Sequence, residues 1–244
     1  MIQKNIKKFK DFIKNYYRYL ECNGGCGSSS SIPNFDLYSR DYLRFAQKSF
    51  DQGGDDGLIN CVSNLKRAMD CELDTFLFII DLYNLFKKKN LKVEQKLNFI
   101  QAIGLFSSKS LENLNKVRNK MEHDYRVPDL IDIEKYFELV EALIRSLQMA
   151  GTLLSLNEEQ NFNIYDENKN EIGYLNLEYK KLKNYPCIQI SWNIHNEIES
   201  IEVTPRDYNL FAYCLKIHPL LYQKDSIGSL NYIYSEIERI DTNL

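Results

Sequence analysis

The segment LINCVSNLKRAMDCELDTFLFIIDLYNLFKKKN, from Leu58 to Asn90, carries the helical pattern that decides the fold of this chain. Apolar residues recur along it at intervals of three and four, which places them on one face of a helix. These residues are Leu58, Val62, Leu65, Met69, Leu73, Phe76 and Ile80. The pattern predicts a long helix, bent at most once, that buries this face in a core.

The flanking sequence extends the helical pattern over residues 1–156. Helices are expected near 1–20, 34–50, 92–106 and 132–156, and another precedes Pro128. The lysines near the N-terminus are typical of the solvated face of a bundle helix, with a membrane-surface or RNA-binding role as the alternative. The Gly- and Ser-rich run CNGGCGSSSS and the GGDDG of residues 53–57 are predicted to be loops.

The pattern changes near residue 157, where alternation of apolar and polar residues replaces helical spacing. Ile188, Ile190 and Trp192 share one face of a predicted strand. Three or four antiparallel strands are expected as a meander, followed by helices. The sequence therefore predicts a mainly α fold with a smaller α+β part: a helical domain over 1–156 and a β-meander module with terminal helices over 157–244.

Composition excludes some classes of function. The chain has 244 residues, of which 44% are hydrophobic and 27% charged, and a net charge of −3 offers no global attraction to nucleic acid. No apolar run is predicted to span a membrane. Without an export signal, the six cysteines are expected to be reduced cytoplasmic thiols. Cys22 and Cys26 have zinc-compatible spacing, but no matching pair follows, so we expect no metal and no cofactor.

The chemically richest stretch is LNKVRNKMEHDYRVP, from Leu114 to Pro128. On a helix its apolar residues form a buried stripe, and the polar residues lie off the core. The stripe consists of Leu111, Leu114, Val117 and Met121. Arg118 and His123 lie about 140° apart around an ideal helix, so a second copy of the helix, a distorted helix end or arginine's length must bring them together. Pro128 places His123 near the helix C-terminus, where the helix dipole stabilises an imidazolium.

These residue types suit cleavage of an RNA phosphodiester. A histidine can accept the proton of a 2′-hydroxyl or donate one to the leaving 5′-oxygen. Arginine can hold the phosphate and stabilise its developing charge, and asparagine can orient either group. The alternative is a solvated helix face on which Arg118 pairs with Glu122, and His123 contacts only water.

The sequence RNKMEH, Arg118 to His123, resembles the signature of the HEPN superfamily, in which Arg, usually followed by Asn, precedes a His near a helix end. The resemblance covers about residues 1–154. It implies a helical bundle that forms a homodimer, with both motif helices lining one cleft. Many members are metal-independent endoribonucleases that leave a 2′,3′-cyclic phosphate and act as bacterial toxins or antiviral effectors.

By the same resemblance, Arg118 binds phosphate, His123 is the acid/base and Asn119 orients them. Lys120, Glu122 and Tyr125 complete the expected substrate-binding group, with Glu122 either tuning His123 or pairing with Arg118 or Lys120. The order Arg, four residues, His, one residue, Tyr also resembles HEPN toxins whose partner nucleotidyltransferase modifies the tyrosine. The implied partners are therefore RNA, a second copy of the chain, and an antitoxin or nucleotidyltransferase.

Other readings stay open at this point. The chain could be a non-catalytic HEPN module that binds a nucleotide or a partner protein. Trp192 could stack on single-stranded RNA, although the core of a small sheet is its more common place. His195 and His218 are expected to be structural or surface residues.

Overall fold

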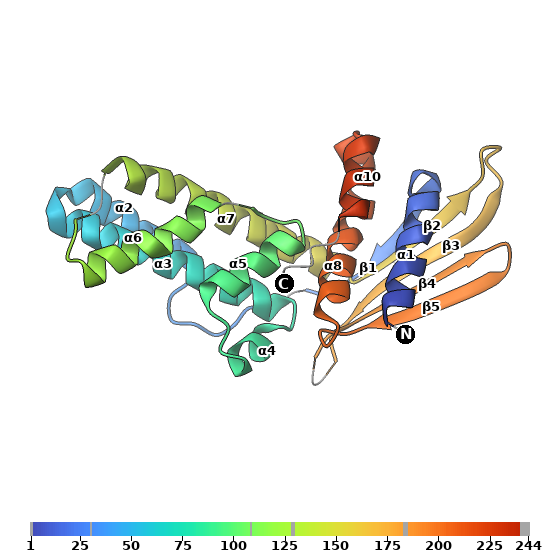
Figure 1. Cartoon of the computed structure of the whole chain (residues 1–244), viewed down its shortest axis with the longest axis horizontal. Helices are drawn as coiled ribbons and strands as arrows, with labels where there is room; N and C mark the ends of the chain where they lie inside the picture. The colour runs from blue at the N-terminus through green and yellow to red at the C-terminus, as the bar shows by residue number, and fades with distance from the viewer. Residues whose placement is uncertain (1, 30, 108, 128–129, 183–184, 240–244) are drawn as a thin grey trace.

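The computed structural model describes residues 2–29, 31–107, 109–127, 130–182 and 185–239. Its elements form two lobes that lie side by side along the long axis of the molecule (Figure 1). We call α2 to α7 the helical lobe, and β1 to β5 with α1, α8, α9 and α10 the sheet lobe. The fold is thus mainly α with a smaller α+β part, as the sequence predicts.

The helical lobe is organised around α3, which contacts both α2 and α7 along its length and α6 over a shorter stretch. Its elements are α2 (Ser39–Gln52), α3 (Gly54–Ile79), α4 (Tyr83–Lys88), α5 (Val93–Ala102), α6 (Lys109–His123) and α7 (Leu130–Leu156). The predicted face of α3 is confirmed, because Val62, Leu65 and Met69 are fully buried. Each such side chain contributes about 1.5–3 kcal/mol when it leaves water, so this face holds the lobe together.

Both ends of α3 differ from the prediction in detail. The GGDDG segment is not a loop: α3 begins at Gly54, and Asp55 and Asp56 lie in its first turn. Carboxylates there interact favourably with the positive end of the helix dipole. The long helix ends at Ile79, and Asp81 takes a left-handed conformation with φ of 57° before α4 starts.

The sheet lobe contains one antiparallel sheet with strand order β1-β2-β3-β4-β5. Its elements are α1 (Ile2–Tyr16), β1 (Leu20–Cys26), β2 (Glu159–Tyr165), β3 (Glu171–Lys180), β4 (Cys187–Ile194), β5 (Glu197–Val203), α8 (Tyr208–Tyr222), α9 (Lys224–Ile227) and α10 (Leu230–Glu238). Strands β2 to β5 are the predicted meander. Leu175 pairs with Trp192 and Leu177 with Ile190, so the apolar faces of β3 and β4 coincide.

The N-terminal segment corrects the predicted division of the chain. The first half of the run expected to be a Gly/Ser loop belongs to β1, which pairs with β2 at the edge of the sheet. Glycine allows this pairing, because a Cβ at Gly25 would lie 2.5 Å from the carbonyl oxygen of Glu159. The helical domain expected over 1–156 is therefore divided: residues 2–26 belong to the sheet lobe.

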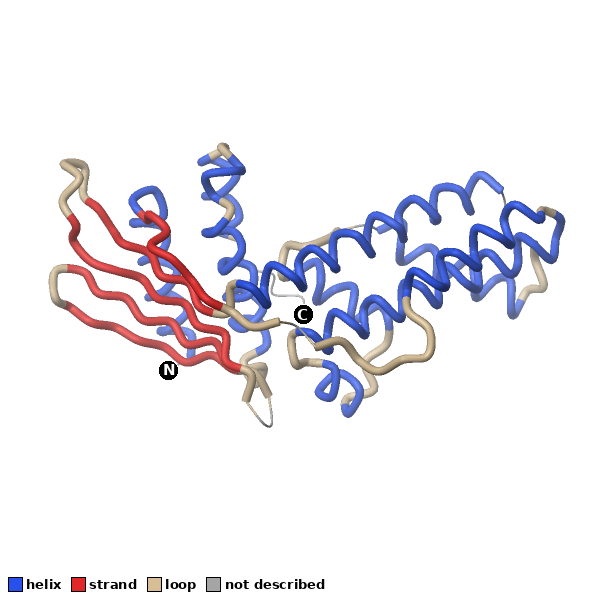
Figure 2. Tube along the Cα trace, turned by 180° about the vertical axis from the view of Figure 1, so that it is seen from behind, coloured by secondary structure: helices blue, strands red, loops and turns tan. Residues whose placement is uncertain are grey.

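Helices α1 and α8 lie against one face of the sheet, and α10 packs beside α1 (Figures 1 and 2). The ring of Phe12 on α1 stacks on Trp192 at 5.0 Å between centroids, and Phe9 lies 5.9 Å from the same ring. Trp192 is only 6% exposed. It is a core residue, and the alternative of an RNA-stacking platform is wrong. Helix α1 is likewise a sheet-covering helix and not part of a bundle.

One helix within the described ranges, Asp132–Leu156 of α7, is long and apolar enough to cross a membrane by length and composition. The sequence did not predict this. Its inward face packs into the core of the helical lobe, where Ile133, Val140 and Leu143 are fully buried. This buried face accounts for part of the apolar composition of α7.

Candidate functional site

Helix α6, which carries the predicted motif, runs along the helical lobe beside α3 and α7 (Figure 1). Its apolar stripe is confirmed: Leu111 and Leu114 are fully buried, Met121 is 8% exposed, and Val117 packs against the same core. These contacts hold α6 against α3 and α7. Of the polar residues between them, Asn113, Lys116 and Lys120 are exposed.

The C-terminal end of α6 is a sharp turn. The helix ends at His123, and the Asp124 N–H donates a hydrogen bond to the carbonyl oxygen of Lys120 at 2.9 Å. Tyr125 then takes a left-handed conformation with φ of 55° and is 90% exposed. A bulky side chain is uncommon in that conformation, so the turn carries backbone strain. Because α6 ends at His123, Tyr125 lies beyond the last turn of the helix.

His123 and Lys120 are both exposed in the last turn of α6. The backbone of Arg118, Asn119 and Glu122 lies in the last two turns, but their side chains lie outside the described part of the structure. By helix geometry, Lys120 and His123 share a face, and the Cα of Arg118 lies about 140° around the helix axis from that of His123. One copy of the helix thus separates the predicted acid/base from the predicted phosphate ligand.

A groove with a volume of about 330 Å³ lies between α6 and α7. Its lining residues are Asn113, Lys116, Val117, Lys120, Asp132, Lys135 and Tyr136. We call it the lysine groove. Lys116, Lys120 and Lys135 are exposed, and none of the three makes an ion pair with a residue that the structure describes. The described lining therefore has three ammonium groups and one carboxylate, a balance that suits an anion despite the acidic charge of the whole chain.

The lysine groove shares a face of α6 with His123, the last residue of the motif. Lys116, Lys120 and His123 follow one another at intervals of four and three, so they form one row along α6. Sequence reasoning singled out Lys120 and His123 but missed Lys116 and Lys135. The spacing of Lys116 from Lys120 was a readable signal, whereas the position of Lys135 depends on how α7 packs back against α6.

The other candidate residues have structural roles. His195 and Asn196, with φ of 48° and 70°, form the two-residue turn between β4 and β5. His218 is 3% exposed, and its Nδ1 lies 3.3 Å from the amide nitrogen of Gln160. Cys22 and Cys26 are exposed free thiols on β1, and no group of three or more metal-binding side chains occurs among the described residues.

Comparisons of the chain with protein-family models, with curated proteins and with solved structures gave no match. The functional assignment therefore depends on the residues and geometry of α6 and of the lysine groove.

Proposed function

We propose that this protein is a metal-independent HEPN-type endoribonuclease that acts as a homodimer. The observation that carries the proposal is the row of Lys116, Lys120 and His123 on one exposed face of α6, beside the lysine groove. A titratable imidazole next to a basic groove is the arrangement that acid/base chemistry on a phosphodiester requires.

The proposed reaction is a transesterification. His123 either accepts the 2′-hydroxyl proton or donates a proton to the leaving 5′-oxygen, and a water molecule makes the other proton transfer. The 2′-oxygen attacks phosphorus and the bond to the 5′-oxygen breaks, which gives a 2′,3′-cyclic phosphate and a 5′-hydroxyl. Arg118 stabilises the charge on the phosphate, and Asn119 orients the reacting groups. Lys120 and the rest of the lysine groove hold neighbouring phosphates, and Glu122 tunes His123 or pairs with a neighbouring cation.

The homodimer supplies the geometry that one subunit lacks. A twofold axis near the ends of two α6 helices would place Arg118 of one subunit opposite His123 of the other. Mixing the Arg118→Ala and His123→Ala variants tests this directly. With random mixing, half of the dimers contain both variants. Each mixed dimer has one intact Arg118–His123 pair where the wild type has two, so the mixture should regain about a quarter of the wild-type activity. No recovery would refute the shared cleft.

The proposed setting is a cytoplasmic toxin or antiviral effector that is controlled by an antitoxin or a nucleotidyltransferase. Tyr125 supports this part of the proposal, because its side chain is 90% exposed and follows the last residue of α6 by only two positions. A nucleotide attached there would block approach to His123. The added mass of a nucleotide on Tyr125 in protein from its native host would identify such a partner.

The experiment that tests the proposed function is RNA cleavage with EDTA present. We expect the purified protein to cleave bulk RNA, and the His123→Ala and Arg118→Ala variants to be at least about 100-fold slower. His195→Ala is the matched control, because His195 is also exposed but lies in the turn between β4 and β5. Equal activity in all four proteins would point to a contaminant. No cleavage by the wild type would favour the non-catalytic alternative.

A further inference from the structure

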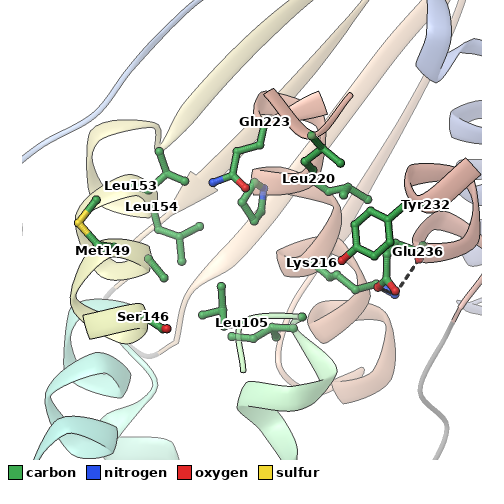
Figure 3. A pocket seen from close by; sticks show the side chains of 15 residues that line it. Leu105, Ser146, Met149, Leu153, Leu154, Lys216, Leu220, Gln223, Tyr232 and Glu236 are labelled. Carbon is green, nitrogen blue, oxygen red and sulfur yellow. Dashed lines mark hydrogen bonds and ion pairs between the residues drawn. The ribbon is translucent and has the colours of Figure 1, made fainter. Parts of the chain in front are cut away.

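A second cavity lies where the two lobes meet, away from α6. It is about 330 Å³ in volume and opens between the end of α5, the last turns of α7, and helices α8 and α10 (Figure 3). We call it the interlobe pocket. This volume falls within the range of small-molecule sites and corresponds to about eleven water molecules. A ligand of about a dozen non-hydrogen atoms would fill it.

One side of the interlobe pocket is apolar. Leu153 and Leu154 from α7 face Leu220 from α8, and Leu105 closes the floor. The rings of Pro219 and Tyr232 also belong to the wall. A flat ring can pack against such rings and leucine side chains with little loss of conformational entropy.

The opposite end contains a buried ion pair. Lys216, which is 4% exposed, donates to the carbonyl oxygen of Glu236 at 2.7 Å, and its Nζ lies 3.6 Å from the Glu236 carboxylate. Arg239 contacts the same carboxylate at 3.1 Å. Lys216 therefore already has a carboxylate and a carbonyl oxygen as partners, and the Glu236 carboxylate already contacts two cations. A charged ligand would lose its hydration at this end and would have to compete with these existing contacts.

Neutral hydrogen-bonding groups complete the polar end. In Figure 3 the amide of Gln223 and the hydroxyl of Tyr232 both point into the pocket. Together these groups offer both hydrogen-bond donors and acceptors, which suits a ligand whose polar end also donates and accepts hydrogen bonds. Tyr232 is 50% exposed, so its hydroxyl is accessible to an incoming molecule.

We propose that the interlobe pocket binds an uncharged, ring-containing molecule whose amide or hydroxyl head lies against Tyr232 and Gln223. Its ring packs between the leucines of α7 and α8. The ligand contacts helices from both lobes, so its binding links them. This inference does not depend on the proposed ribonuclease activity, since no residue of α6 contributes to the pocket.

Three probes with one ring system test the proposal: 2-naphthamide, which is neutral, 2-naphthoate, which is anionic, and 2-naphthylmethylammonium, which is cationic. In calorimetric titrations of the full chain, we expect 2-naphthamide to bind with a Kd on the order of 0.1 mM. The two charged probes should bind at least about tenfold more weakly.

Variants locate the binding. Leu153→Trp fills the apolar side and should abolish the binding of 2-naphthamide. Tyr232→Phe removes one partly exposed hydroxyl, which the fold tolerates, and should weaken binding about three- to tenfold. Tyr234→Phe is the matched control, because Tyr234 lies on the same helix outside the pocket and is 41% exposed. Absence of 2-naphthamide binding, tighter binding of a charged probe, or equal affinity in Tyr232→Phe and the wild type would overturn the proposal.

Discussion

Acidification should destabilise this protein through His218. The imidazole is buried on α8, and burial lowers its pKa from 6.5 to about 4. Between these two values the unfolded chain binds a proton that the native state does not, so the unfolding free energy falls as the pH falls. The slope is about 1.4 kcal/mol per pH unit. Relative to neutral pH, this single group therefore lowers the unfolding free energy by about 2 kcal/mol at pH 5 and about 3 kcal/mol at pH 4.

The assay is urea unfolding at a series of pH values from 7.5 to 4.5, for the wild type and for His218→Gln. Glutamine does not bind a proton in this pH range, so the substitution removes the pH dependence that His218 contributes. Any loss of packing changes the unfolding free energy by the same amount at every pH. We therefore expect the pH dependence to become shallower by about 1.4 kcal/mol per unit below pH 6.5. His195→Gln, in the exposed turn between β4 and β5, is the control for replacing a histidine elsewhere in the sheet lobe. Equal slopes for His218→Gln and the wild type would refute the assignment of this pH dependence to His218.

Three further predictions concern the helical lobe. Tyr125→Gly should raise the unfolding free energy by about 0.5–1 kcal/mol, because glycine tolerates the left-handed φ of 55°; an unchanged urea midpoint would contradict the inferred strain. Glu72 is 2% exposed and accepts hydrogen bonds from Ser39 and Gln148. In urea unfolding, Glu72→Ala should lower the unfolding free energy by about 2–4 kcal/mol, and Glu72→Gln by less than about 1 kcal/mol. Equal losses in the two variants would exclude the polar network as the cause. Lys116→Glu reverses one charge of the lysine groove and should weaken RNA binding about tenfold, as measured by fluorescence anisotropy. The affinity should also depend less on salt concentration. An unchanged salt dependence would show that the lysine groove does not contact the RNA.

Local patterns predicted the faces of the helices well. The buried residues of α3 and of α6 follow from spacing alone, because helical periodicity records which side leaves water. The meander of β2 to β5 was also readable, since alternation and turn residues are local signals. These elements give the fold class.

Long-range pairing was not readable in the same way. Strand β1 is rich in glycine and cysteine and resembles a loop, and only its partner β2, more than a hundred residues later, makes it a strand. The pattern of α1 shows one apolar face but not the Trp192 ring that it covers. For the candidate site, the motif on α6 was visible, whereas the lysine groove needed the return of α7 to bring Lys135 beside Lys116.

The chemistry at His123 can be read most directly from the ends of the RNA fragments. The protein should be incubated with bulk RNA in EDTA, and the fragment termini determined by mass spectrometry. The account predicts 2′,3′-cyclic phosphates opposite 5′-hydroxyls for the wild type, and loss of those fragments in His123→Ala. Fragments with 5′-phosphates and 3′-hydroxyls, or unchanged cyclic phosphates from the His123→Ala variant, would contradict it.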